Sequence, residues 1–170
     1  PHAYELRSFV TEPLAASPLS YEPGATAREA AKMLADHAAD EAMAVAGGTD
    51  LYPNMKRRQF TPKVLIGLHR LEESRGIEED DDGVTIRGMT TLTQVENDEI
   101  LQAHYPAIAK AARLVSAPIL RNMGTIGGNL CIDTRCNYYN QNYEWRKSIN
   151  FCMKKDGEIC WVAPSSPRCW

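Results

Sequence analysis

Four cysteines in the last third of the sequence are the residues best suited to chemistry, because thiolates bind metals and take part in redox reactions. They follow the pattern Cys136-x15-Cys152-x7-Cys160-x8-Cys169, with no histidine in residues 131–170. A structural zinc ion normally uses closely spaced CxxC pairs, which are missing here. Disulfides need an oxidising compartment, and the sequence shows no export signal. Four dispersed thiols fit a 4Fe-4S cluster best, and zinc is the next alternative.

Aromatic and basic residues surround these cysteines. The aromatic side chains could seal a small shell around a cluster, and the cations could offset its negative charge or dock an acidic electron donor. The aromatics are Tyr138, Tyr139, Tyr143, Trp145, Phe151, Trp161 and Trp170, and the cations are Arg135, Arg146, Lys147, Lys154 and Lys155. The alternative interpretation is an ordinary core with solvated charges. Cys131 lies beside a glycine-rich turn and is expected to be a small buried residue, not a ligand.

Two glycine-rich turns form a second candidate site. "AVAGGTDL" (residues 44–51) and "GTIGGNL" (residues 124–130) each combine paired glycines with a threonine. Glycines let backbone N–H groups approach a ligand closely and form an anion-binding nest. Neither turn is a GxGxxG or P-loop motif, and each alone could be an ordinary tight turn. Together they could clamp the two phosphates of one dinucleotide.

Two lobes must position these residues. A short strand is expected at residues 4–9, and a helix over residues 25–40, with Thr26 as its N-cap and Glu29 at the capping-box position. Buried strands are expected at residues 42–48 and 63–68. Together these elements give an N-terminal β–α–β lobe over residues 1–68.

The second lobe, residues 69–170, is expected to be α+β. An aspartate-rich turn ending at Gly83 predicts a hairpin, and residues 91–124 are predicted helical, with interruptions before Pro106 and Pro118. A strand is expected at residues 125–132, followed by an irregular loop over residues 131–170. The chain stops directly after the last cysteine, so we expect this lobe to be incomplete.

Bulk properties exclude several classes of protein. The net charge is −3 with acidic and basic residues mixed, which gives no electrostatic case for nucleic-acid binding. A membrane span is not expected, since there is no run of eighteen apolar residues. The absence of a signal pattern favours a cytoplasmic protein. The four histidines are scattered, and no catalytic residue is nominated.

Three motifs in order resemble the flavin-binding subunits of molybdenum hydroxylases, the xanthine dehydrogenase family. They are "AGGTDL", "RGMTTL" and "ILRNMGTIGGNLC". The resemblance implies a two-lobed FAD-binding domain of the vanillyl-alcohol-oxidase/PCMH type. It also implies that the two glycine turns hold the FAD pyrophosphate, with paired threonines near the flavin. The residues carried over are Ala46, Gly47, Gly48, Thr49, Asp50, Leu51, Thr90, Thr91, Thr125, Ile126, Gly127, Gly128 and Asn129.

The cysteine-rich segment is similar to the inserted loop of 4-hydroxybenzoyl-CoA reductase β subunits, which carries a 4Fe-4S cluster. This resemblance implies an electron-transfer subunit that binds FAD and 4Fe-4S. Its partners would be a molybdenum-cofactor large subunit, where the substrate reacts, a 2Fe-2S small subunit and a ferredoxin-type donor. Two alternatives remain: the FAD subunit of a xanthine-dehydrogenase-like oxidising hydroxylase, and a zinc-stabilised interaction module.

Overall fold

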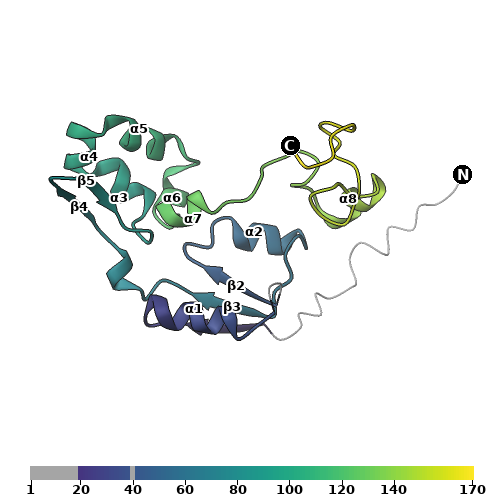
Figure 1. Ribbon diagram of the computed structural model, residues 1–170, viewed down its shortest axis with the longest axis horizontal. Coiled ribbons are helices and arrows are strands. Elements are labelled where there is room, and N and C mark those ends of the chain that lie inside the picture. The colour runs from purple at the N-terminus through teal and green to yellow at the C-terminus, as the bar shows by residue number, and fades with distance from the viewer. Residues whose placement is uncertain (1–18, 39–40) are drawn as a thin grey trace, which may run out of the picture.

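The computed structural model describes residues 19–38 and 41–170 (Figure 1). The strand expected at residues 4–9 lies outside these ranges. None of the described helices is long and apolar enough to cross a membrane.

A three-stranded parallel sheet organises the N-terminal part. Its strands are β1 (Ser20–Pro23), β2 (Ala42–Val45) and β3 (Val64–Gly67), in the order β1-β3-β2. Both outer strands pair with β3 in matching register, so that Val64 lies opposite Ser20 on one side and Ala42 on the other. All four residues of β3 are buried, as expected for the central strand of a parallel sheet. The two strands predicted at residues 42–48 and 63–68 are therefore confirmed.

Helix α1 (Ala27–Ala35) covers this sheet. The Thr26 hydroxyl accepts a hydrogen bond from the Glu29 backbone N–H, and the Glu29 carboxylate accepts one from the N–H of Ala25. The predicted cap is thus confirmed, with the carboxylate reaching one residue before the N-cap. Ala30 packs against Ala42, Val64 and Ile66, which removes apolar surface of helix and sheet from water.

A short helix that the sequence did not predict, α2 (Leu51–Lys56), follows β2 and the first glycine turn. Asp50 is its N-cap residue, and the Asp50 carboxylate accepts a hydrogen bond from the side-chain amide of Asn54 at 3.0 Å. Six residues are too few for helical periodicity to stand out in the sequence.

The predicted hairpin consists of β4 (Ile77–Asp80) and β5 (Gly83–Ile86), which pair antiparallel. The Asp80 carboxylate accepts hydrogen bonds from the backbone N–H groups of Asp82 and Gly83, and Gly83 has a φ of 141°. A single-turn 3-10 helix, η2 (Glu72–Ser74), precedes the hairpin.

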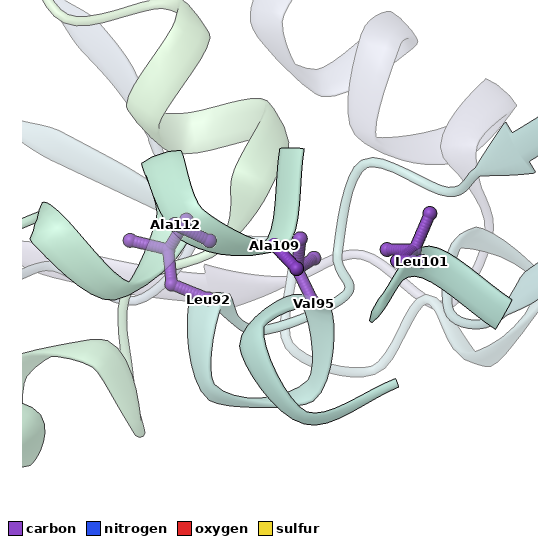
Figure 2. Packing of buried hydrophobic residues seen from close by; sticks show 5 residues of the cluster. All are labelled: Leu92, Val95, Leu101, Ala109 and Ala112. Atoms are coloured by element: carbon purple, nitrogen blue, oxygen red, sulfur yellow. The ribbon is translucent and has the colours of Figure 1, made fainter. Parts of the chain in front are cut away.

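Four helices fill the region predicted to be helical. They are α3 (Leu92–Asn97), α4 (Glu99–His104), α5 (Pro106–Leu114) and α6 (Pro118–Arg121). Each of the two prolines begins a helix, where its missing N–H costs nothing. Figure 2 shows the core that joins α3, α4 and α5, built from Leu92, Val95, Leu101, Ala109 and Ala112.

The strand predicted at residues 125–132 is wrong, because this segment begins with helix α7 (Ile126–Leu130). Thr125 caps the helix by accepting a hydrogen bond from the N–H of Gly128 at 3.1 Å. The N–H of Asn129 then bonds to the carbonyl of Thr125 at 2.9 Å. The cap thus outweighs the low helix propensity of two glycines. The irregular segment that follows contains a single described helix, α8 (Tyr143–Ser148).

Candidate functional site

A cavity of about 770 Å³ lies between the N-terminal sheet and the helices of the second part. The first glycine turn and helix α7 both contribute to its lining. Ten of the residues predicted to bind the cofactor line it: Ala46, Gly47, Gly48, Thr49, Asp50, Leu51, Thr125, Gly127, Gly128 and Asn129. The two turns that were paired by residue type alone therefore face one space.

The two turns also touch each other. A Cβ atom on Gly47 would overlap the carbonyl group of Met123, lying 2.5 Å from its carbon. A Cβ on Gly128 would come within 3.6 Å of the Ala46 Cβ atom. The glycine at position 47 is thus required for the approach of the two backbones, and the approach shapes the cavity.

Two further close contacts fix the geometry of the turns. The N–H of Gly127 donates to the carbonyl of Gly88 at 2.8 Å, and a Cβ on Gly127 would lie 2.7 Å from that oxygen. Gly48 has a φ of 70°, in the left-handed region, and a Cβ there would overlap the ring of Tyr52. Both glycines therefore have structural reasons for their identity that hold without any ligand.

Three of the predicted residues do not line the cavity. The hydroxyl of Thr90 is buried and bonds to both the N–H and the carbonyl of Gly76, at 3.0 Å each. Thr91 caps α3 in a complete capping box with Gln94. Ile126 packs against the helical core. Hydrogen bonding and packing within the protein thus account for these side chains, and contact with a cofactor remains a prediction for all three.

Arg121 lines the same cavity and was not predicted. Its Nε donates to Glu96 at 2.8 Å, and its Nη1 donates to the carbonyls of Val115 and Ser116 at 3.2 and 3.0 Å. Ser116 has a φ of 51°, so Arg121 stabilises a strained turn at the cavity edge. The arginine was visible in the "ILRNMG" motif, but no sequence rule distinguished it from a surface cation.

A second, much smaller cavity of about 20 Å³ lies in the cysteine-rich segment. All four predicted ligand cysteines line it, together with Thr134, Tyr138, Tyr139, Met153, Lys154, Trp161 and Val162. Cys152 and Cys160 are buried, Cys136 and Cys169 are half-buried, and all four are free thiols. The chain thus brings thiols that are up to 33 positions apart, from Cys136 to Cys169, to the lining of one cavity.

Cys131 is not among them. It is exposed and lines the large cavity, so the prediction that it is a small buried residue is wrong. It lies at the end of α7, where the helix turns its last side chain outward instead of continuing a strand into the core.

Arg146 holds the irregular segment together. Its side chain is 1% exposed, and its guanidinium carbon lies 5.7 and 5.4 Å from the ring centroids of Tyr139 and Phe151. One Nη donates to the carbonyl of Lys155 at 3.1 Å and to the carboxylate of Asp156 at 3.2 Å. A cation packed between rings and bonded to backbone replaces the core that so short a segment cannot build.

Local electrostatics favour thiolate at one of the cysteines. Hydrogen bonds from the backbone at Trp170 and Ala163 lower the pKa of the Cys160 thiol. The hydrogen-bonded ion pair of Lys154 with Asp133, 2.6 Å long, lowers the pKa of the carboxyl and raises the pKa of the amine. Lys154 therefore stays charged at the rim of the small cavity. The lowered pKa of Cys160 favours its thiolate, which is the form of cysteine that binds metals.

The four cysteines of the small cavity can be compared with the ligands and the space that a zinc ion or a 4Fe-4S cluster needs. The described ranges contain no group of three or more His, Cys, Asp or Glu side chains placed to hold a metal ion, so the four thiols are not arranged as a tetrahedral zinc site or as the ligands of any other single ion. Four cysteines are nonetheless the donor set of a four-iron cluster, and all four line one cavity. That cavity has room for about one water molecule.

Comparison with known proteins identifies the family of the larger site. Residues 17–140 match the family described as the FAD binding domain in molybdopterin dehydrogenase. The chain belongs to this family. The match spans both glycine turns and ends before three of the four clustered cysteines, so it covers the glycine turns of the large cavity but only part of the lining of the small one.

Relatives with similar sequences are FAD-binding subunits or medium chains of dehydrogenases. The xanthine dehydrogenase FAD-binding subunit of Escherichia coli O157:H7 is 38% identical over 113 residues, covering 66% of this chain and 38% of the relative. The carbon monoxide dehydrogenase medium chain of Hydrogenophaga pseudoflava is 42% identical over 90 residues, covering 53% and 31%. This chain therefore matches less than half the length of either relative.

Solved structures show the same fold. A carbon monoxide dehydrogenase from Hydrogenophaga pseudoflava that lacks the Mo-pyranopterin moiety superposes with a TM-score of 0.63 at 38% identity, covering 66% of this chain and 39% of that one. A quinoline 2-oxidoreductase from Pseudomonas putida 86 gives a TM-score of 0.62 at 28% identity, covering 66% and 39%. The mixed α/β FAD-binding fold is thus confirmed.

Proposed function

We propose that the chain is an electron-transfer subunit that binds FAD in the large cavity and a 4Fe-4S cluster through Cys136, Cys152, Cys160 and Cys169. The observation that carries the proposal is the gathering of these four thiols around one cavity, next to the cavity of an FAD-binding family. No side chain of the chain is assigned a catalytic role.

The large cavity supports FAD binding by size and by lining. Its volume of about 770 Å³ lies within the range of roughly 300–1,000 Å³ that is usual for ligand pockets. Gly47 and Gly48 leave backbone accessible where side chains would block it, and Thr49 and Asn129 supply polar groups to the lining. FAD, when bound, can exchange one or two electrons and so connects one-electron carriers.

Two cations support a negatively charged cluster in the small cavity. Lys154 lines the cavity, and Arg146 is packed against Tyr139 in its wall. Met153, Val162 and three aromatic rings, Tyr138, Tyr139 and Trp161, give the cavity a largely apolar lining, although Cys136 and Cys169 stay half-buried. Low polarity and nearby positive charge are both factors by which a protein sets the reduction potential of such a cluster.

The complete assembly would be a cytoplasmic, molybdenum-containing enzyme similar to 4-hydroxybenzoyl-CoA reductase. Electrons from a ferredoxin-type donor would pass through the cluster and FAD to a 2Fe-2S small subunit and a molybdenum-cofactor large subunit. There the phenolic hydroxyl of the substrate would be removed. Both partners and the substrate are inferred from the resemblance of residues 133–170 to this group of enzymes.

A second candidate is the FAD subunit of an oxidising hydroxylase. It is favoured by the relatives, which are xanthine, carbon monoxide and nicotinate dehydrogenase subunits. The two candidates differ in the direction of electron flow. Reduction of the bound flavin by reduced ferredoxin, in the absence of any organic substrate, favours the first; reduction only when an organic substrate is added to the assembled enzyme favours the second.

Exchanging one cysteine tests the cluster directly. In anaerobically purified Cys152→Ser protein we expect loss of iron and sulfide, or conversion to a three-iron form, with flavin content unchanged. Cys131→Ser is the matched control, because Cys131 lies outside the small cavity and should leave the iron content at the wild-type value. Zinc in place of iron, or equal iron in both variants, would refute the assignment.

A further inference from the structure

Residues 131–136 form a wall between the two cavities. Cys131, Ile132, Asp133 and Arg135 line the large cavity, whereas Thr134 and Cys136 line the small one. Figure 1 shows this stretch leaving α7 and running to the cysteine-rich segment at the C-terminal end of the chain. A change on one side of the wall therefore acts on residues that also bound the other side.

An ion pair crosses this wall. The Lys154 ammonium, in the small cavity, lies 2.6 Å from the carboxylate of Asp133, which lines the large cavity. A charge bound in either cavity therefore interacts electrostatically with one member of this ion pair and, through it, with the rim of the other cavity.

The cysteine-rich segment also contacts α2 at both of its ends. In front of the helix, the Arg135 guanidinium pairs with the carboxylate of Asp50, the last residue before α2. Behind it, the side-chain amide of Gln59 donates to the carbonyl of Tyr139, and the Lys155 ammonium donates to the carbonyl of Gln59. Helix α2 directly follows the first glycine turn, so these contacts fix the position of the turn.

The Gln59–Tyr139 contact behind α2 is buried, whereas the Lys155–Gln59 contact is only partly buried. Gln59 is 0% exposed and Tyr139 is 5% exposed, so water cannot replace a lost hydrogen bond there. Arg135 is half-exposed, and its partner Asp50 lies at the edge of the large cavity. The cysteine-rich segment is thus linked to α2 by a buried contact at Gln59 and by a half-exposed contact at Arg135, and Arg135 can be replaced without disturbing a buried core.

From this arrangement we infer that loading the four-thiol cavity strengthens FAD binding in the large cavity, with α2 as the element that links them. The inference rests on the proposed function. Four bonds from a cluster to thiols spread over residues 136–169 would fix the segment in one arrangement. The fixed segment holds Arg135 and Tyr139 against α2 and keeps the first glycine turn ready to bind.

Linkage makes the effect reciprocal. If the cluster raises the affinity for FAD by some factor, FAD raises the retention of the cluster by the same factor. Couplings of this kind typically amount to about 5- to 150-fold, and both directions can be measured on the same protein.

The test is an FAD titration, followed by flavin fluorescence, on flavin-free protein at two iron contents. One sample is reconstituted anaerobically with ferrous iron and sulfide, and the other is stripped of iron with a chelator. We expect FAD to bind about 5- to 150-fold more weakly to the stripped protein. At equilibrium with a competing chelator, FAD should raise the apparent affinity of the protein for its iron by a comparable factor.

Variants test the route. In Arg135→Ala and in Gln59→Ala the ratio of the two dissociation constants should fall toward one. Arg135→Ala keeps the test valid should the buried Gln59 variant unfold. Lys147→Ala is the control, because Lys147 is exposed on α8, and it should keep the wild-type ratio.

The outcomes separate the inference from the proposed function. Failure of the wild-type protein to take up iron and sulfide overturns the proposed function. Uptake of iron with the same FAD affinity in both samples overturns the inference alone. An unchanged ratio in both Arg135→Ala and Gln59→Ala overturns the route through α2, even where Arg135→Ala weakens FAD binding equally in the two samples.

Discussion

Replacing Gly47 with alanine should force the two glycine turns apart. The added Cβ would overlap the Met123 carbonyl, 2.5 Å from its carbon, and would lie 3.0 Å from the nitrogen of Gly124. Both neighbours are backbone atoms, so no side-chain rotation can relieve the overlap. Inserting a methyl group into a tightly packed site costs about 1–3 kcal/mol, and we expect about 3 kcal/mol here because the backbone must move.

Thermal unfolding of flavin-free protein measures this cost. For a chain of this size, 1 kcal/mol corresponds to roughly 2–4 °C in Tm, which gives a decrease of about 6–12 °C for Gly47→Ala. Gly88→Ala is the matched control, since its Cβ would meet only the Cα of Gly127 at 3.9 Å. It should stay within about 0.5 kcal/mol of wild type. Equal Tm values for the two variants would show that contact between the turns does not determine the geometry of the cavity.

Two other perturbations test local features of the fold. Thr91→Ala removes the capping box of α3 and should lower the free energy of unfolding in urea by about 1 kcal/mol, whereas Thr91→Ser should retain most of it. Lys154→Met breaks the half-exposed pair with Asp133 and should cost about 0–1 kcal/mol at neutral pH. The pKa of Asp133 is lowered, so its stabilisation is complete above the ordinary carboxyl pKa of about 4 and is lost as the pH falls through the lowered value. The raised pKa of Lys154 keeps its own contribution until the pH rises past about 10.5. The difference in Tm between wild type and Lys154→Met should therefore be constant from about pH 5 to pH 9 and should shrink as the pH falls below the ordinary carboxyl pKa toward the lowered one; a difference that does not shrink in acid would contradict this assignment.

Elements with a strong local signal could be predicted from the sequence. The helix capped by Thr26, the turn ending at Gly83 and the helices that start at Pro106 and Pro118 all depend on interactions within a few residues. The pairing of the two glycine turns was also predictable, first from their similar residue types and then from the resemblance to a family, but not from any distance between them. Local rules cannot state that Gly47 touches Met123.

Two predictions were wrong, a strand at residues 125–132 and a buried Cys131, and the first of them also reflects contacts between residues distant in the sequence. Residues 125–132 contain β-branched and apolar side chains around two glycines, which is typical of a strand entered through a turn. Helix α7 forms instead because Thr125 caps it and because Gly127 needs the close backbone contact with Gly88, a partner distant in the sequence. Cys131 was expected to be buried because free cysteines generally are, and that general tendency takes no account of its place at the end of α7, where it is exposed.

The four-thiol cavity was predicted in part. The sequence indicated which cysteines belong together, by their number and their lack of CxxC pairs. It did not indicate that Arg146 would be buried between two rings, because six lysines and arginines in the segment look alike in one dimension. Nor did it indicate the hydrogen bonds between Gln59 and the cysteine-rich segment.

The contact between residues 47 and 123 also bears on how the chain folds. Closing so long a loop costs chain entropy that neighbouring contacts cannot repay, so contacts of this range generally form late. The sheet of the first part and the helical core of the second are each built from segments nearby in the chain, and both can form before the two turns meet. We therefore expect a partly folded chain to have secondary structure before the two turns meet, and FAD to stabilise mainly the last step of folding.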